Sequence, residues 1–402
     1  MTTNTLLTVD MITNEALRVL HQKLNFIGTV DRQYDDQFAK SGAKIGSTLR
    51  IRKPPQFTVR SGATLDVQNA VEDYTSLSVT TQKGVDMSFT SVELAMSVDQ
   101  FSDRFLKPAM SRLAAEVESN FMSYAYKKVY QQSSTSTFTA ALDFDTVLGG
   151  RTKLTNALAP ADGRVANLNT RANAEFVSAG KALFHDATTI AEQYREGMVG
   201  RTAGFDFYEN TFWPRHTSGS DASAYVTNSA TAEAQTGSTI LVTTGTGTFK
   251  AGDIITIGGV YRVHPETKVT TGDLMQFVIT ADISANATQI TISPAIVASG
   301  ATQNVSNGAA NTQAITKVGG ASKAYDISLA YHKEFATFAT ADLLLPGGVD
   351  FASRKVLDGI SMRCIRQYDI NNDTLPCRFD ILYGYEVIRP EFACRIASHG
   401  DA

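Results

Sequence analysis

The chain has 402 residues, of which 43% are hydrophobic and 19% are charged, a globular composition with room for two or three domains. Its 36 basic and 40 acidic residues give a formal net charge of −4, so no overall positive field draws it to nucleic acid or to an anionic membrane. The N-terminus has no cationic region before an apolar run, and no window reaches eighteen apolar residues. Only three cysteines occur, Cys364, Cys377 and Cys394, without CxxC spacing. We therefore expect a soluble protein of a reducing compartment, the cytoplasm.

The first predicted element is a helix within residues 7–28. Leu17, Leu20 and Leu24 recur in helical register, and Asp10 or Thr13 can cap its start. A helix at the end of the chain, followed by a segment that leads away through Gly28, forms an arm that can pack on its own core or on a neighbour.

Residues 45–94 alternate polar and apolar side chains, which predicts a long two-stranded hairpin with its tip near residues 62–70. An isolated hairpin is marginal in water, so we expect it to need a partner surface. Arg50, Arg52, Lys53 and Arg60 make one side basic. A solvated strand face and an ion-pairing surface for an acidic neighbour explain this charge equally well.

The longest helical pattern runs from Pro108 to Tyr130, with proline at the first helical position. At 1.5 Å per residue this helix spans about 34 Å, the diameter of a small domain. We interpret it as a spine on which other elements are laid.

Mixed segments follow the spine. Helical patterns cover residues 145–158 and 172–185, and a short strand is predicted between them at 165–170. Residues 217–321 are dense in Thr, Ser, Gly, Ala and Asn, and contain four strand-like stretches separated by turn residues, namely STILVTT, DIITIGGVYRVH, LMQFVITADI and TQITISPAIV. They predict a small β-barrel or sandwich inserted into an α/β pattern. The last predicted strands, in FDILYGYEVIRPEFACRI, join around Gly384.

A search for catalytic patterns finds almost nothing. The Thr/Gly run at 243–248 lacks a phosphate-loop signature, and the six histidines form neither HExxH nor a Cys/His cluster of metal spacing. We expect no cofactor, no metal and no catalytic residue, and interpret the chain as a non-enzyme.

The order of elements resembles the major capsid (coat) proteins of tailed bacteriophages, in the branch typified by lambdoid short-tailed phages with an inserted β-barrel. The resemblance is carried by SVDQFSDRFLKPAMSRLAAEVE, LAYHKEFATFATADLLLPGGVDFA and MRCIRQYDINNDTLPCRFDILYGYEVIRPEFACRI. It implies an α+β tailed-phage capsid fold. The implied divisions are an N-terminal arm at 1–32, an extended β-hairpin loop at 33–96, a peripheral domain with the spine helix at 97–185 and 379–402, an axial domain at 186–216 and 323–378, and a β-rich insertion at 217–322.

The function implied by this resemblance is self-assembly into the hexamers and pentamers of an icosahedral head that encloses double-stranded DNA. Implied partners are other copies of the chain, a scaffolding protein, a portal protein at one vertex and weakly bound DNA, with assembly in the host cytoplasm and no membrane. The chain starts directly with the arm, so we expect scaffolding to be a separate protein and no pro-region to be removed. We predict inter-subunit contacts at Leu17, Leu20 and Leu24 of the arm and at Arg50, Arg52, Arg60 and Asp66 of the loop.

Two alternatives remain. An adhesive or carbohydrate-binding surface protein built on the insertion would use Trp213, Tyr225 and Tyr261 to stack on sugars. An enzyme with a dispersed active site is weaker, because no acid/base pair or metal cluster can be named.

Overall fold

The computed structural model describes residues 9–32, 48–60, 62–65, 67–69, 72–89, 105–135, 140–180, 201–220, 225–229, 233–243, 245–357, 360–371 and 374–400. The chain forms two compact units. One consists of Met1–Ile51, Tyr74–Phe121 and Ala336–Ile388, and the other of Arg52–Asp73, Met122–Phe335 and Arg389–Ala402. Both combine helices with sheets, so the predicted α+β class is confirmed.

The first unit is built on a five-stranded antiparallel sheet. Its order is β15 (Ala336–Ala341), β18 (Leu375–Val387), β17 (Ile360–Arg366) and β16 (Phe351–Leu357), with β3 (Thr81–Phe89) also on β18. The N-terminal part of β18 pairs with β3 and β17, and its C-terminal part pairs with β15. This long strand therefore holds the unit together.

The hairpin prediction for residues 45–94 is only partly right. A short sheet of β1 (Thr48–Arg52) and β2 (Tyr74–Ser78) forms, but β3 leaves it and pairs over its whole length with β18. Local alternation of polar and apolar residues identifies a strand, but it does not identify the strand with which it pairs. Here that strand, β18, lies about 300 residues away in the sequence.

The predicted junction at Gly384 is wrong. Gly384 lies inside β18, and the turn comes later, at the 3₁₀ helix η5 (Pro390–Phe392) before β19 (Ala393–Ser398). A Cβ atom on residue 384 would clash with the carbonyl oxygen of Ser78. The glycine is needed for the close approach of β2, not for a turn.

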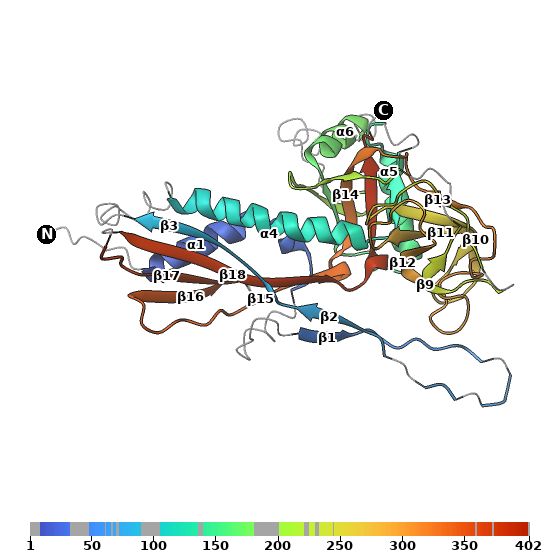
Figure 1. Ribbon diagram of the computed structural model, residues 1–402, viewed down its shortest axis with the longest axis horizontal. Coiled ribbons are helices and arrows are strands. Elements are labelled where there is room, and N and C mark those ends of the chain that lie inside the picture. The colour runs from blue at the N-terminus through green and yellow to red at the C-terminus, as the bar shows by residue number, and fades with distance from the viewer. Residues whose placement is uncertain are drawn as a thin grey trace. The chain divides into compact units, whose positions relative to one another are not determined.

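Two helices cover this sheet (Figure 1). The predicted first helix, α1 (Val9–Lys23), packs on β16 and β17 and is followed by the 3₁₀ turn η1 (Ile27–Thr29). The predicted spine, α4 (Lys107–Lys128), stacks Phe121 on Tyr385 of β18 with ring centroids 4.9 Å apart. The chain passes from the first unit to the second within α4, after Phe121.

The second unit contains a seven-stranded sheet. Its order is β4 (Gln132–Ser134), β19, β14 (Ala324–His332), β5 (Arg164–Leu168), β7 (Phe205–Glu209) and β6 (Arg201–Thr202), and β8 (Arg215–Thr217) also pairs with β14. After β14 comes the 3₁₀ turn η4 (Lys333–Phe335). The predicted helices are α5 (Phe144–Asn156), capped by Asp143, and α6 (Thr170–Gly180); the rest of the second prediction, 181–185, lies outside the described residues.

The insertion is a second, separate sheet of the same unit, and all four predicted strands are present. They are β9 (Gly237–Leu241), β10 (Ile254–Val263), β11 (Thr270–Ile279) and β12 (Gln289–Ile296), joined by β13 (Ile315–Lys317) in the order β13-β10-β11-β12-β9. Residues 225–228 bridge the two ends of this order, through bonds from Ile315 N–H to the Tyr225 carbonyl and from Thr243 N–H to the Val226 carbonyl. The sheet is thereby closed into a barrel, one of the two architectures predicted from the sequence.

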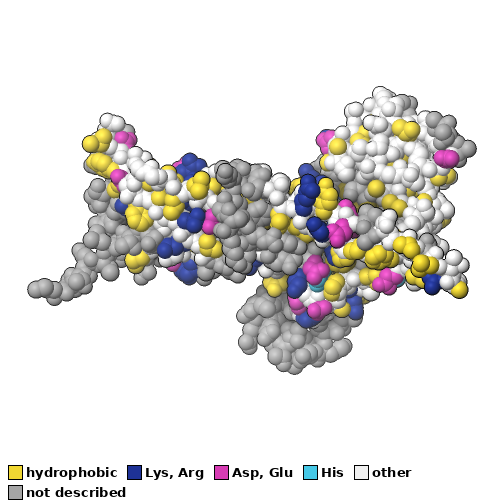
Figure 2. Space-filling model, turned by 90° about the horizontal axis from the view of Figure 1, so that it is seen from below, with side chains coloured by type: hydrophobic (Ala, Val, Ile, Leu, Met, Phe, Trp, Pro, Cys, Tyr) yellow, Lys and Arg dark blue, Asp and Glu magenta, His cyan; other side chains and the backbone are white. Residues whose placement is uncertain are grey.

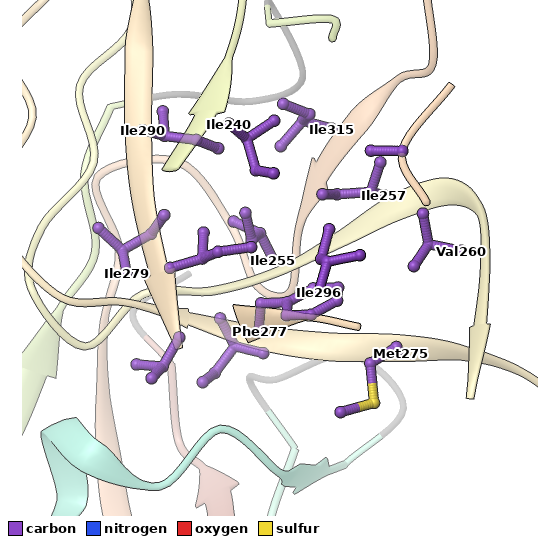
Figure 3. Packing of buried hydrophobic residues seen from close by; sticks show 14 of the residues in the cluster. Ile240, Ile255, Ile257, Val260, Met275, Phe277, Ile279, Ile290, Ile296 and Ile315 are labelled. Carbon is purple, nitrogen blue, oxygen red and sulfur yellow. The ribbon is translucent and has the colours of Figure 1, made fainter. Parts of the chain in front are cut away.

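The barrel has its own apolar core. The inward side chains come from all five strands and are largely isoleucine, valine and phenylalanine, including Ile240, Ile255, Phe277, Ile290 and Ile315 (Figure 3). β-branched residues pack well on a pleated surface, which explains why so Thr- and Gly-rich a segment folds.

Candidate assembly surface and attachment of the insertion

The extended loop between β1 and β2 is the part of the described chain that exposes most apolar surface in a short stretch. Phe57 is 58% exposed, Val59 97%, Leu65 78% and Val67 77%. Hydrophobic side chains line this segment on the face seen in Figure 2. A run of exposed apolar residues is typical of surfaces through which proteins contact one another.

Side chains, not a strand ladder, hold the tip of this loop together. The amide of Gln68 donates to the Thr58 carbonyl at 2.6 Å and accepts from the Thr58 N–H at 2.7 Å. Arg60 donates to the carbonyls of Gly62 and, at 3.1 Å, of Thr64. The loop therefore keeps an extended form without pairing all of its backbone groups within the chain.

The base of the loop is held by ion pairs. Arg52 lies 3.0 Å from Glu72, and Lys53 lies 3.8 Å from Asp73. Arg50 stacks its guanidinium over the Tyr74 ring at 5.0 Å. Residues 52–73 carry three basic residues (Arg52, Lys53, Arg60) and three acidic ones (Asp66, Glu72, Asp73), so the net charge is 3 − 3 = 0. The basic side predicted from the sequence is thus largely balanced from within the chain.

The predicted contact residues fall into three groups. Arg50, Arg52 and Arg60 lie on β1 or the loop, with the partners just given. Asp66 lies outside the described residues. Leu17, Leu20 and Leu24 are at most 7% exposed and lie in the core of their own unit, where α1 packs on the sheet.

A buried polar network attaches the insertion to the seven-stranded sheet. Nε2 of His216, on β8, lies 2.8 Å from Oδ1 of Asp253, at the start of β10. The other oxygen of Asp253 accepts the N–H groups of Gly219 and Lys250 at 3.0 and 2.8 Å. Arg395 of β19, fully buried, donates to the Gly252 carbonyl and stacks on Tyr126 of α4 at 5.5 Å.

The protonation of this network follows from its burial. Burial lowers the pKa of His216 more than Asp253 raises it, and nearby Arg395 and Lys127 lower it further. Burial alone would raise the pKa of Asp253, but the bonds from His216 and from two backbone N–H groups lower it overall. Neutral His216 therefore donates Nε2–H to ionised Asp253, which leaves Nδ1 to accept the Tyr126 hydroxyl at 3.4 Å.

A second polar contact lies at β4. The side chain of Gln276, on β11, accepts the Gln132 N–H at 2.9 Å and donates to the Gln132 carbonyl at 3.2 Å, while Lys153 of α5 donates to the same amide oxygen at 3.0 Å. Sequence reasoning missed both contacts, because their members stand far apart and form no motif.

The residues of the adhesive alternative do not form a binding surface. Trp213 is 8% exposed and donates its indole N–H to Asn167 at 2.7 Å. Tyr225 is fully buried, with its hydroxyl on the carbonyls of Gly245 and Gly247. Two of the three predicted stacking residues are thus core residues, and in the Thr/Gly run Gly245 and Gly247 accept the Tyr225 hydroxyl.

Within the described ranges, three or more His, Cys, Asp or Glu side chains nowhere gather in a way that could hold a metal ion. In the same part of the chain, no helix is both long and apolar enough to cross a membrane.

Comparison with solved structures finds phage capsids. The Mycobacterium phage Che8 structure is 13% identical, over 92% of this chain and 89% of that chain, with a TM-score of 0.49. The capsid of Ralstonia phage GP4 is 7% identical, over 93% and 88%, with a TM-score of 0.45. The CUS-3 coat protein I-domain is 28% identical over 25% of this chain and 97% of that chain, with a TM-score of 0.19. Scores this low decide nothing by themselves.

A comparison with curated proteins found no match. The model of the family described as P22 coat protein, gene protein 5, matches residues 1–395, nearly the whole chain. The chain belongs to the P22 coat protein family. This coat protein is therefore a major capsid protein of an icosahedral phage head and part of the virion, and it is a structural protein, not an enzyme.

Proposed function

We propose that this coat protein assembles into hexamers and pentamers through the extended loop at residues 52–73, which lies on a neighbouring copy. The predicted divisions into arm, extended loop, peripheral domain, axial domain and insertion belong to the same proposal. Assembly takes place in the host cytoplasm with a scaffolding protein, and a portal protein occupies one vertex.

The exposed apolar residues of the loop carry this proposal. Phe57, Val59, Leu65 and Val67 are all more than half exposed. Burying one such side chain contributes about 1.5–3 kcal/mol. The contact made by a single loop is modest, so monomers stay soluble. A closed shell repeats that contact in every subunit, so the assembled lattice is stable.

The backbone of the loop supports the same conclusion. Between Lys53 and Asp73 the described residues contain no strand, and the Thr58–Gln68 pair replaces a ladder bond with side-chain bonds. Backbone N–H and C=O groups left without a partner strand are available to a neighbouring chain.

Of the basic residues in the loop, Arg60 is the one best placed to determine which surface of a neighbouring copy the loop binds. Arg52 and Lys53 have acidic partners in their own chain, whereas Arg60 is held by backbone carbonyls near the tip. We infer that it faces an acidic surface of the adjacent copy, where it fixes the register more than it adds affinity.

The packaged genome is a weak partner in this proposal. With a net charge of −4 the protein has no strong general attraction for phosphates. Contact with double-stranded DNA is therefore non-specific and weak, which allows the genome to be packed and released.

The decisive experiment places a charge on the loop. Val59→Asp should leave the chain folded but prevent shells, so negative-stain microscopy and sedimentation should show free subunits or small rings. Val269→Asp, at a site 63% exposed on the insertion, is the matched control and should assemble normally. Normal shells from the Val59→Asp protein would refute the loop as a contact.

A second variant tests the charge. Arg60→Glu should slow assembly or lower the stability of shells towards urea, while circular dichroism of the free subunit stays unchanged. Shells of unchanged yield and stability would show that Arg60 faces solvent.

A further inference from the structure

The thiols of Cys364 and Cys377 lie face to face in the first unit. Their sulfur atoms are 3.3 Å apart, and both side chains are buried. Cys364 is on β17 and Cys377 on β18, where Cys364 stands opposite Phe379 and Arg366 stands opposite Cys377. The two cysteines are therefore diagonal neighbours on one face of the sheet.

Cys364 and Cys377 differ in their burial, their hydrogen bonds and the direction of their pKa shifts. Cys364 is completely buried, whereas Cys377 keeps 5% of its surface exposed. Thr13, on the face of α1 that packs against this sheet, gives a side-chain hydrogen bond to Cys364. Bonds from Cys377 and Thr13, together with the charge of Arg366, lower the pKa of Cys364, although burial and Asp380 oppose the shift. The pKa of Cys377 is raised because its thiol donates to Cys364 and is buried.

We propose that Cys364 and Cys377 form an oxidisable dithiol site, which a peroxide converts into a disulfide within one chain. The sulfur atoms must approach by about 1.2 Å to reach the bonded distance of about 2.05 Å. Rotation about the Cα–Cβ bonds supplies part of this approach. The hairpin ends a few residues away, at the turn closed by the Asp369–Thr374 bridge, so the strand ends can supply the rest.

The chemistry balances with hydrogen peroxide as the oxidant. The Cys364 thiolate attacks one peroxide oxygen and becomes a sulfenic acid, while the other oxygen leaves as hydroxide and takes up a proton to form water. The Cys377 sulfur then attacks the Cys364 sulfur, and the hydroxyl leaves with the Cys377 proton as a second water. Two thiols and one peroxide give one disulfide and two waters, and a thiol reductant reverses the change.

Cys394 provides an internal comparison. It is also fully buried, on β19 in the other unit, but its thiol donates to the carbonyl of Arg395 at 3.5 Å and does not face a second thiol among the described residues. Burial raises its pKa to about 11, which disfavours the reactive thiolate. The site thus depends on the pairing of two thiols, and it does not depend on assembly, because both belong to one unit of one chain.

The test is a thiol map of the native protein. Purified subunits are treated with hydrogen peroxide, freed of peroxide with catalase, denatured, labelled with N-ethylmaleimide and analysed by mass spectrometry. We expect labelled cysteines to fall from three to one, with Cys394 still labelled, a linked Cys364–Cys377 peptide pair, and full labelling restored by dithiothreitol.

Variants define the pair. Cys364→Ser and Cys377→Ser should each abolish the linked peptide, whereas Cys394→Ser should form it as the wild type does. The wild-type peptide map decides the question even where a serine variant fails to fold. Three labelled cysteines after a treatment that oxidises dithiothreitol in a parallel tube without the protein would overturn the proposal. So would a link between two chains, or sulfinic acids at both positions without a link.

Discussion

The carboxylate of Glu118, buried in the middle of α4, accepts the backbone N–H of Phe26 at 2.6 Å. The same oxygen accepts the N–H of Ile27 at 3.4 Å. The segment that follows α1 is thereby fixed to the spine helix by one side chain, and Phe26 packs edge-on against Phe121 at 5.1 Å.

The first prediction removes that acceptor. Glu118→Ala should lower the free energy of unfolding by about 1–3 kcal/mol, because two buried N–H groups lose their partner. Glu118→Gln keeps an oxygen acceptor and should cost less. Urea unfolding of the free subunit measures both. Equal losses for Ala and Gln would show that the charge of Glu118, and not its acceptor role, matters.

A second prediction concerns Gly252 in the attachment of the insertion. Its φ is +101°, and a Cβ there would lie 3.2 Å from both His216 and Lys127. Gly252→Ala should destabilise the protein by the backbone strain, about 1–2 kcal/mol, plus a packing cost. Gly300→Ala, at φ +88° with nothing within 4 Å, should pay the strain alone. Equal urea midpoints for the two variants would contradict the packing argument.

The third prediction is a pH dependence. The folded-state pKa of His216 is lowered, so its contribution to stability is complete above its ordinary pKa of about 6.5 and declines as the pH falls below that value. The lowered pKa of Asp253 acts in the same direction, but only below about pH 4. Urea midpoints should therefore fall between pH 7 and pH 5.

A variant tests whether His216 causes this fall of the urea midpoint with pH. His216→Gln keeps a donor for Asp253 and an acceptor for Tyr126 but does not titrate, so the fall between pH 7 and pH 5 should become smaller. It should not vanish, because burial also lowers the pKa of His332. An unchanged slope in the His216→Gln protein would place the titration elsewhere.

The fourth prediction tests the core of the insertion. Tyr225→Phe removes the hydroxyl that serves the carbonyls of Gly245 and Gly247, at 3.0 and 2.9 Å, and should cost about 1–3 kcal/mol. Tyr261→Phe, at a ring 40% exposed, should change stability by less than about 0.5 kcal/mol. Calorimetry of the full chain compares them, and similar losses would argue against a structural role for the buried hydroxyl.

The sequence predicted the helices and strands better than it predicted which strands pair with one another. The helices at α1, α4, α5 and α6 and the four barrel strands carry strong local periodicity, and all were found. The pairing of β3 with β18 and the continuity of β18 through Gly384 depend on contacts between segments that are distant in the chain. No local pattern contains that information.

The candidate site shows the same division. Arg60 was named from the sequence as a contact residue, but the exposed Val59 was not, and the burial of Leu17 and Leu20 depends on what α1 covers. The His216–Asp253–Arg395 network joins residues from three separated segments, so only the fold identifies it.

The insertion leaves and rejoins the sheet on paired strands. Thr217 of β8 stands opposite Ala324 of β14, and the Ser218 N–H donates to the Lys323 carbonyl at 2.9 Å. The barrel is therefore a module at the end of a ready-made hairpin. Any replacement must supply a carbonyl for Arg395 and a carboxylate for His216, because both side chains would otherwise be left buried without those partners. A grafting experiment that exchanges this module should carry Gly252 and Asp253 with it.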